Sequence, residues 1–163
     1  MYKQLSDLDW DEWAPQDNAT LLFVVQDEKI LLIRKKRGLG AGKINGPGGR
    51  LEGSETPLEC AVRETEEELF IQPSGITGYG QLDFQFTNGY SLRCFVFRAD
   101  EFTGDPTETD EAEPLWFNTK EIPYNEMWED DRIWLPLLLQ RQSFSGQFIF
   151  DDDEMLDHRL TTD

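Results

Sequence analysis

Apolar, β-branched runs recur along the chain and are separated by short polar or glycine-containing segments. Residues 20–26 and 29–34 form the first two runs, and Asp27 and Glu28 between them predict a hairpin or two adjacent strands. Strands are likewise predicted for residues 76–86 and 92–98, joined by a turn, and for residues 114–117, 144–150 and 155–160. Residues 38–55 contain seven glycines, which predicts a loop with unusual backbone geometry.

Two helices are predicted between these strands. Thr56 is placed as the N-cap of the first helix, with Pro57 in the first helical position and Glu59 completing a capping box. The face of this helix that packs on the sheet is expected to carry Leu58, Ala61, Thr65 and Leu69. Residues 132–140 predict a second, apolar helix, although Pro136 lies within it.

The order of these elements lacks a regular alternation of strand and helix and therefore predicts a mixed β-sheet flanked by helices. With 163 residues, 38% of them hydrophobic, the chain is long and apolar enough for one globular domain. We expect this domain to occupy residues 19–163 and to follow an acidic N-terminal arm, residues 1–18. Trp10 and Trp13 indicate that the arm packs against the rest of the chain.

The balance of charge restricts the possible partners. The chain has 33 acidic and 15 basic residues, a formal net charge of -18. Such a field repels a nucleic-acid backbone, so no nucleic acid polymer is expected as a partner. It also repels a free nucleoside triphosphate, which would have to arrive with divalent cations. Most of the excess charge is interpreted as solvated surface.

Targeting and zinc-binding patterns are missing from the sequence. No stretch approaches the roughly 18 apolar residues that a membrane-spanning helix needs, and the first twenty residues do not have the basic and apolar pattern of a secretory signal. Cys60, Cys94 and the single histidine, His158, form neither a disulfide framework nor a zinc pattern. We expect a reducing, cytoplasmic location, no membrane association and no obligate protein partner.

Three glutamates of the first predicted helix, Glu64, Glu67 and Glu68, fall within an arc of about 100° beside its apolar face. All three are expected to be partly buried, whereas Glu59 and Glu66 are expected to face solvent. Like charges at this spacing destabilise a helix by roughly 0.2–0.5 kcal/mol per pair. A bound Mg²⁺ would offset the repulsion, because it prefers carboxylate oxygens. The alternative is an ordinary solvated acidic helix, which the preceding glycine-rich segment makes less favourable.

The spacing of the acidic residues carries a specific motif. The pattern GX5EX7REUXEEXGU, with U a bulky aliphatic residue, is matched at Gly49, Glu55, Arg63, Glu64, Glu67 and Glu68. This spacing resembles the Nudix box of the Nudix hydrolases. Phe70 replaces the last glycine of the motif, and Thr65 replaces an aliphatic residue. Because that glycine normally ends the helix with positive φ, and Phe in that conformation costs about 1 kcal/mol, we expect a locally altered helix end.

The resemblance implies an α/β fold, namely an α/β/α sandwich with a mixed sheet, and Mg²⁺ as cofactor, for which Mn²⁺ can substitute. A water molecule would attack a bridging-diphosphate phosphorus and release a nucleoside monophosphate and pyrophosphate from a triphosphate. The implied metal ligands are Glu64, Glu67 and Glu68 with a carbonyl of Gly48 or Gly49. Arg63 and Glu55 are implied to brace the loop on the helix. The proton acceptor is left open between Glu64 and Glu111, and Glu111 is either a further candidate metal ligand or one of several loop acids.

Residues from about 20 to 160 also resemble one branch of that family, the animal-type MutT homologues that hydrolyse oxidised purine nucleoside triphosphates such as 8-oxo-dGTP. The likeness is densest in KKRGLGAGKINGPGG (residues 35–49) and in WFNTKEIPYNEMWEDDRIWLPLLLQ (residues 116–140). It implies a base pocket of Asn45, Phe84, Trp128, Asp130 and Asp131, with Lys35 and Thr20 as further lining residues. The chain departs from the branch at Ala19 and Pro47 and in its extra acidic arm, which leaves the base preference open.

The implied pocket has a sensible chemistry. Aromatic faces of Trp128 and Phe84 can stack on a purine. The neighbouring Asp130 and Asp131 can bind its Watson–Crick edge, and burying both as anions is costly, so we expect a raised pKa in one of them. Alternatives remain at this point: Asp131 can be the N-cap of the second helix, and the aromatic residues Trp128, Trp134 and Phe84 can all be core.

The leading interpretation is a Mg²⁺-dependent pyrophosphohydrolase that removes oxidised purine nucleoside triphosphates from the nucleotide pool. A Nudix hydrolase of a nucleotide sugar or dinucleotide is the second hypothesis. The third is a catalytically silent module that binds a nucleotide, which the complete set of box glutamates disfavours.

Overall fold

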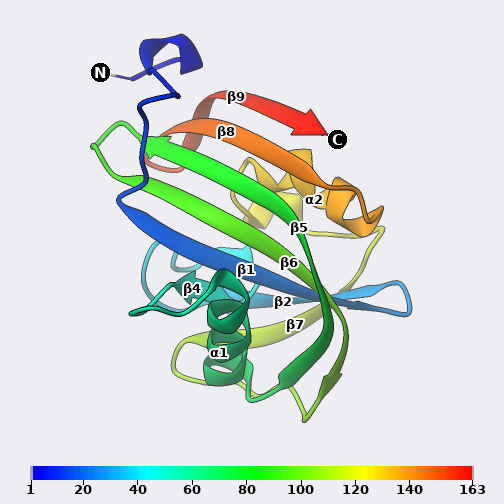
Figure 1. Ribbon diagram of the computed structural model, residues 1–163. Coiled ribbons are helices and arrows are strands. Elements are labelled where there is room, and N and C mark those ends of the chain that lie inside the picture. Colours follow the sequence, from blue (N-terminus) through cyan, green and yellow to red (C-terminus); the bar gives the residue numbers. More distant parts are fainter. Residues whose placement is uncertain (1, 163) are drawn as a thin grey trace.

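A mixed β-sheet forms the centre of the computed structural model, which describes residues 2–162 (Figure 1). Its strands are β1 (Asp17–Gln26), β2 (Lys29–Lys35), β3 (Ile44–Asn45), β4 (Gly48–Arg50), β5 (Gln72–Phe86), β6 (Ser91–Thr103), β7 (Ala112–Asn118), β8 (Phe144–Asp151) and β9 (Glu154–Thr162). The strand order is β3-β2-β1-β6-β5-β8-β9, with β4 paired to β1 and β7 paired to β2. The β1–β6 and β5–β8 pairs are parallel and the other pairs are antiparallel.

Two α-helices cover opposite faces of the sheet. They are α1 (Pro57–Leu69) and α2 (Asp131–Leu139), and short 3-10 helices occur at η1 (Leu5–Asp7) and η2 (Tyr124–Glu126). Because side chains alternate along a strand, Leu22 and Val24 of β1 pack with α1, whereas Phe23 and Val25 pack with α2. The strands in the middle of the sheet are therefore apolar on both faces, and the predicted α/β/α arrangement is confirmed.

Helix α1 begins as its sequence predicts. The Thr56 hydroxyl accepts a hydrogen bond from the Glu59 amide at 3.2 Å, and the Glu59 carboxylate accepts one from the Thr56 amide at 2.9 Å. Ala61, Thr65 and Leu69 are fully buried. The prediction for Leu58 is wrong, because the buried face of the helix begins only at Cys60 and the Leu58 side chain is exposed. The Thr65 hydroxyl donates to the Ala61 carbonyl at 2.8 Å, which satisfies a polar group that replaces an aliphatic one.

The end of α1 contradicts our expectation of an altered geometry. Phe70 itself adopts the left-handed conformation, with φ 58° and ψ 34°, and its amide donates to the Glu66 carbonyl at 2.9 Å. The following loop holds this end in place, because the Thr107 amide and the Thr109 hydroxyl both donate to the last helical carbonyls at 2.9 Å. The helix therefore ends as it would with glycine, and the phenylalanine ring lies exposed.

The glycine-rich segment is more regular than predicted. Residues 44–45 pair with β2, and residues 48–50 pair with the start of β1, so the prediction of a loop throughout 38–55 is wrong there. A Cβ on Gly48 would lie 1.8 Å from the Thr20 carbonyl oxygen, which explains why only glycine fits this close pairing.

Most other strands are confirmed and extend beyond their predicted ends. Strand β1 starts at Asp17, within the segment predicted as the N-terminal arm. Trp13 donates to Gln85 of β5, whereas Trp10 contacts Leu5 and Trp13 of the arm itself. Pro136 lies inside α2, which is only nine residues long and buries Trp134, Leu135 and Leu138.

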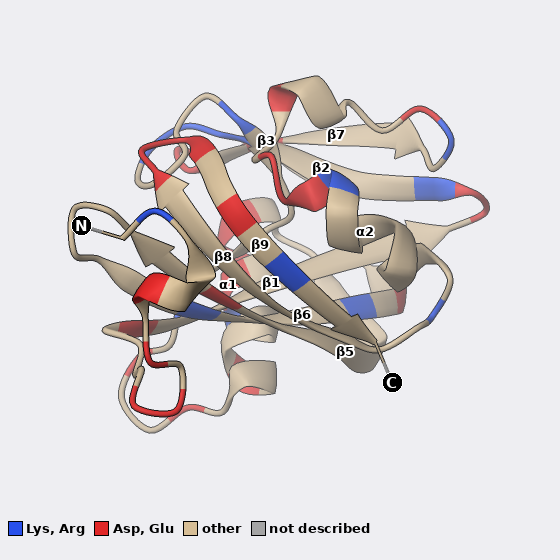
Figure 2. Cartoon of the chain, turned by 90° about the horizontal axis from the view of Figure 1, so that it is seen from above, with Lys and Arg blue, Asp and Glu red and all other residues tan. Residues whose placement is uncertain are grey.

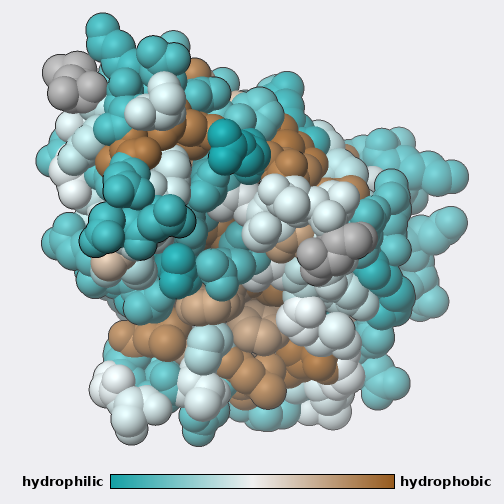
Figure 3. Space-filling view, turned by 45° about the horizontal axis from the view of Figure 1, so that its top comes forward, coloured by the Kyte–Doolittle hydropathy of each residue, from teal (hydrophilic) through white to brown (hydrophobic). Residues whose placement is uncertain are grey.

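The acidic residues are spread over loops and strand ends around the molecule, as Figure 2 shows. The face drawn in Figure 3 is mostly hydrophilic, and hydrophobic residues reach the surface in the lower part of that view and between hydrophilic residues in its upper part. Within residues 2–162, no helix is long and apolar enough to cross a membrane.

The left-handed backbone conformation of Phe70 leads to a prediction about the stability of the fold. Phe70→Gly should raise the free energy of unfolding by about 1 kcal/mol relative to Phe70→Ala, because alanine keeps the strained Cβ and glycine does not. Both variants lose the same exposed ring, so the comparison isolates the backbone. Urea denaturation of the two variants measures the difference. Equal midpoints would show that the Phe70 conformation carries no strain.

Candidate functional site

Three carboxylates converge beside α1. Glu64, Glu68 and Glu111 each offer an oxygen, and these oxygens lie within 4.8 Å of one another. Glu64 and Glu68 come from α1, whereas Glu111 comes from the loop before β7. The prediction that Glu67 is partly buried with them is wrong, because its side chain is 53% exposed and contacts Arg63 instead. Glu59 is exposed as predicted, while Glu66 is only partly so.

The loop after β6 brings Glu111 to the helix. The Thr109 hydroxyl donates to the Glu68 carbonyl at 2.9 Å and accepts from the Glu111 amide at 3.2 Å. The Glu111 side chain is less buried than the two helical glutamates and pairs with Arg37 at 3.2 Å. Hydrogen bonds at the end of α1 thus determine where the third carboxylate lies.

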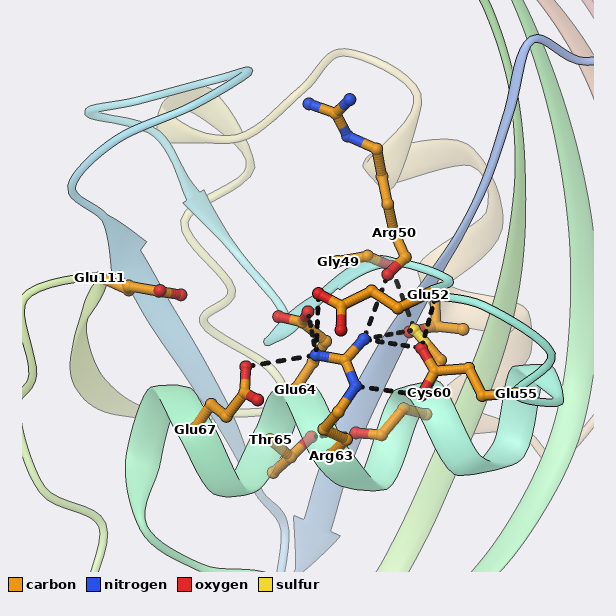
Figure 4. A network of polar contacts seen from close by, with 12 residues as sticks. Gly49, Arg50, Glu52, Glu55, Cys60, Arg63, Glu64, Thr65, Glu67 and Glu111 are labelled. Carbon is orange, nitrogen blue, oxygen red and sulfur yellow. Dashed lines mark hydrogen bonds and ion pairs between the residues drawn. The ribbon is translucent and has the colours of Figure 1, made fainter.

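Arg63 is the centre of a polar network that ties the glycine-rich segment to α1 (Figure 4). Its guanidinium donates to both oxygens of Glu55 at 2.7 and 3.0 Å, to Glu64 at 2.8 Å and to Glu67 at 3.2 Å. It also donates to the Arg50 carbonyl at 3.2 Å. The bidentate pairing holds the pKa of Glu55 down at about 2. The planar fork of arginine fixes the loop and one cluster carboxylate together.

Gly49 allows the Glu64 carboxylate to approach the main chain of β4. A Cβ at this position would lie 2.4 Å from Cδ of Glu64, so any larger residue would displace the carboxylate. The Gly49 carbonyl accepts a hydrogen bond from the Cys60 thiol at 3.4 Å. Cys60 and Cys94 are both free and buried.

The surroundings of the carboxylate cluster disfavour the ionised forms of Glu64 and Glu68. Burial, reinforced by the charges of Glu64 and Glu111, raises the pKa of Glu68 to about 9. Burial also raises the pKa of Glu64. Glu68 Oε2 is buried and has no hydrogen-bond partner among the described residues. A group of hard oxygen donors with one unpartnered buried oxygen fits a divalent cation of the magnesium type.

A cavity of about 520 Å³ opens next to this cluster. Its wall includes all seven residues predicted to bind the substrate, namely Thr20, Lys35, Asn45, Phe84, Trp128, Asp130 and Asp131. Gly48, Gly49 and Glu68 line the same cavity. The predicted base pocket therefore shares one cavity with Glu68 of the predicted metal cluster. A second, smaller hollow of about 280 Å³ on the outer sheet face includes Gln81 and Arg159 and contains none of these residues.

Aromatic side chains form one part of the cavity wall. Trp128 is partly buried and meets Phe86 and Phe150 edge-on, with ring centroids 6.3 and 5.6 Å apart. Phe84 is stacked on Phe148 at 5.2 Å and is also only partly buried. Trp128 and Phe84 are therefore not simple core residues, whereas Trp134 is completely buried and belongs to the core.

Asp130 and Asp131 form a buried pair of acids at the cavity. Asp130 accepts a hydrogen bond from the Trp134 indole at 2.7 Å, and burial raises its pKa to about 6. Burial and the adjacent Asp130 charge raise the pKa of Asp131 well above its ordinary value. Asp131 Oδ2 is buried without a partner among residues 2–162. The N-cap position of α2 is held by Asp130 rather than Asp131, and its side chain makes no capping bond.

Two further polar groups lie on the wall. Asn45 Oδ1 accepts a hydrogen bond from the Gly46 amide at 2.8 Å, which uses one of the two lone pairs of this oxygen. Burial lowers the pKa of Lys35, and the nearby Glu68 charge partly opposes that shift.

Several cavity residues were not predicted from the sequence. They are Ala19, Leu21, Ile33, Gly38, Leu39, Gly46, Arg50, Phe86, Asn88, Tyr90, Leu92, Cys94 and Phe150. The alternation of strand residues offered a signal for one of them, because Phe86 lies two positions after the predicted pocket residue Phe84 and therefore shares its face. Tyr90 and Asn88 lie at the β5–β6 turn, and their sequence gives no such signal.

Residues 15–138 match the NUDIX domain family, and the chain belongs to that family. Proteins of this family generally need a divalent cation, which agrees with the donor set of the carboxylate cluster.

Two animal proteins are similar over most of the chain. The chain is 42% identical over 143 residues to an oxidized purine nucleoside triphosphate hydrolase of Danio rerio, covering 86% of this chain and 92% of that protein. A protein of Mus musculus with the same description is 40% identical over 138 residues, covering 84% and 88%. Among solved structures, a MutT protein from Bacillus halodurans aligns with a TM-score of 0.79 and 28% identity, covering 88% of this chain and 97% of that one.

The buried aspartate pair predicts an unusual dependence of stability on pH. Folding raises the pKa of Asp131 above 3.8, so the folded chain keeps a proton that the unfolded chain releases. Stability should therefore fall as the pH rises from about 4; the contribution of Asp130 is lost through about pH 6, and that of Asp131 is lost in the same direction. Asp131→Asn should flatten this decline, and the exposed control Asp105→Asn should not. Thermal unfolding across pH 4–8 tests this; parallel curves for all three proteins would contradict it.

Proposed function

We propose that the chain is a Mg²⁺-dependent pyrophosphohydrolase of oxidised purine nucleoside triphosphates, converting 8-oxo-dGTP to 8-oxo-dGMP and pyrophosphate. The observation that carries this proposal is the single cavity that joins an aromatic, acidic pocket to the carboxylate cluster of α1. The dimensions suit a nucleotide, since ligand cavities of about 300–1,000 Å³ are typical for small molecules. The two animal relatives, which are oxidized purine nucleoside triphosphate hydrolases, support the same substrate class.

Metal binding is assigned to the carboxylate end of the cavity. Glu64, Glu68 and Glu111 would hold Mg²⁺, or Mn²⁺ in its place, together with a main-chain carbonyl of Gly48 or Gly49. When bound, the ion neutralises phosphate charge and lowers the pKa of water. Glu67 is the least supported ligand of the predicted set, because it lies outside the cluster and contacts Arg63.

The chain's own groups supply the remaining chemistry at this end. Glu55 and Arg63 would keep the glycine-rich segment fixed on the helix. Glu64 or Glu111 would accept a proton from the attacking water, and the nearness of both carboxylates to Glu68 supports either choice. Lys35 lies on the same wall and would offset the charge of the phosphates.

Base recognition is assigned to the other end. The raised pKa of Asp131 favours its neutral carboxyl form, which can donate one hydrogen bond and accept another, while Asp130 accepts. The edge of an oxidised purine offers both donors and acceptors. Trp128 would stack on the purine, and Phe84, Asn45 and Thr20 would complete the pocket.

The strongly acidic surface suits a substrate that arrives with divalent cations and disfavours polymers of nucleic acid. A cytoplasmic location and a small-molecule nucleotide as the partner complete the proposal. The two buried free thiols agree with a reducing compartment. Residues 19–163 would then act as one catalytic domain.

Pyrophosphate release from 8-oxo-dGTP in the presence of Mg²⁺ tests the reaction. Glu68→Gln should lower kcat by roughly 10²-fold or more while the protein remains folded, because it removes a proposed metal ligand. Glu59→Gln changes an exposed glutamate on the same helix and should behave like wild type. If wild type hydrolyses a nucleotide sugar or dGTP far faster than 8-oxo-dGTP, the proposed substrate is wrong. An active Glu68→Gln variant would refute the metal assignment.

Asp131→Asn tests the recognition of the base. An amide cannot present the same donor and acceptor as a protonated carboxyl, so the preference for 8-oxo-dGTP over dGTP should fall on the order of 10-fold. Metal affinity, measured by calorimetry with Mn²⁺, should stay unchanged. An unaltered ratio of kcat/KM values for the two substrates would assign Asp131 a structural role.

A further inference from the structure

The N-terminal arm is joined to the cavity through the β5–β6 hairpin. The Trp13 indole N–H donates to Gln85 Oε1 at 2.9 Å, and Gln85 Nε2 in turn donates to the carbonyls of Phe86 and Tyr90 at 3.0 and 3.2 Å. Gln85 is 5% exposed, so these bonds are shielded from water. One side chain therefore links the arm to the main chain of the hairpin.

The arm passes beside this hairpin before it enters β1 (Figure 1), and further hydrogen bonds join the two. The Gln16 amide donates to the Ser91 hydroxyl at 2.9 Å, and its N–H also contacts the Ser91 carbonyl at 3.1 Å. The Tyr90 hydroxyl donates to Asp17 at 2.8 Å. The arm therefore contacts the hairpin on the face of the sheet to which Gln85 points, which is opposite the cavity.

The hairpin presents its other face to the cavity. Phe86 and Tyr90 both line the cavity, and their rings lie 5.8 Å apart. Phe86 also meets Trp128, which we assign to the base. Because neighbouring residues on a strand point to opposite faces, Gln85 faces the arm while Phe86 faces the nucleotide pocket. A displacement of the hairpin would move this wall.

The arm is also fixed at its other end. The Leu5 amide donates to Asp157 of β9 at 2.8 Å, and Leu5 is buried. The Trp10 indole donates to the Leu5 carbonyl at 3.0 Å, and the rings of Trp10 and Trp13 lie 5.4 Å apart. Arg93 lies over the Trp13 ring at 5.6 Å. Trp13 is therefore held in position on several sides.

We propose that Trp13 is a positioning residue for nucleotide binding, which acts through Gln85 on the cavity wall formed by Phe86 and Tyr90. The inference rests on the proposed function for the identity of the nucleotide. It assigns a role to a residue outside the segment that matches the NUDIX family, which begins at residue 15. Trp13 touches neither the cavity nor the carboxylate cluster, so its effect should be on binding of the base and not on the chemical step.

Two variants of Trp13 test the proposal. Trp13→Phe removes the indole N–H but keeps an aromatic ring near Arg93, and Trp13→Ala removes both. Each should raise KM for 8-oxo-dGTP by roughly 3- to 10-fold, the factor that corresponds to the loss of one or two hydrogen bonds. The value of kcat should stay within about twofold of wild type, because the metal cluster is unchanged. Trp116→Ala, an exposed tryptophan on β7, serves as a matched control and should leave both constants unchanged.

A double-mutant cycle with Gln85 shows whether the effect passes through this side chain. In a Gln85→Met background the partner of Trp13 is gone, so adding Trp13→Phe should change KM no further. Amide hydrogen exchange provides a readout that does not depend on substrate. Residues 86–91 should exchange faster in Trp13→Phe, whereas residues of α1 should exchange as in wild type.

The results of these experiments distinguish a failure of the Trp13 proposal from a failure of the proposed function. If wild type binds 8-oxo-dGMP but does not hydrolyse 8-oxo-dGTP, the proposed function fails, and the affinity of the Trp13 variants for the monophosphate decides the role of Trp13. Unchanged KM and exchange rates in both Trp13 variants overturn the positioning role. The role is also overturned if the Trp13 variants lower kcat and leave KM unchanged, or if Trp13→Phe raises KM further in the Gln85→Met background. A wild type that binds no purine monophosphate overturns it as well.

Discussion

The site depends on one arginine that holds two parts of the chain together. Arg63 donates to a carboxylate of the glycine-rich segment, to a carboxylate of the cluster and to a main-chain carbonyl of β4. Without this cation, Glu55 and Glu64 would repel each other and β4 would lose its link to the helix. The guanidinium satisfies them because it is planar and offers several donors at once, which a lysine cannot do. This contact fixes Glu64 of the carboxylate cluster beside β4, whereas the hydrogen bonds of Thr109 at the end of α1 place Glu111.

A second feature of the cavity wall is the presence of carboxyl oxygens that are buried without a hydrogen-bond partner among residues 2–162. Glu68 and Asp131 each keep one carboxyl oxygen buried without a hydrogen-bond partner among residues 2–162, and both have a raised pKa. Such groups lower the stability of the empty protein. Both residues line one cavity, which supports the proposal that a cation completes Glu68 and that the edge of a bound base completes Asp131.

Much of this arrangement could be predicted from the sequence, because it depends on local spacing. The capping box of Thr56 and Glu59 and the buried face of α1 from Ala61 onward follow from fixed intervals along one helix, and the resemblance to the Nudix box implies the pairing of Arg63 with Glu55. Tertiary contacts decided the rest. Glu67 is exposed because Arg63, not the cluster, attracts it, and Phe70 keeps a left-handed conformation because the loop at Thr107 and Thr109 fixes the helix end. The contribution of Tyr90 to the cavity and the contact of Trp13 with Gln85 connect distant segments, which periodicity does not report.

The parallel pairing of β1 with β6 has a consequence for the way the chain reaches its native state. Residues 17–24 pair with residues 92–99, so the middle of the sheet cannot close until about a hundred residues are available. Pairings of such high sequence separation lose much chain entropy before any contact compensates for it, and folds that rely on them form slowly. During synthesis on the ribosome, the early β1–β2 hairpin and α1 would wait without their central partner. Their apolar surfaces are then exposed to association with other chains, and this interval is where the protein is most vulnerable to aggregation.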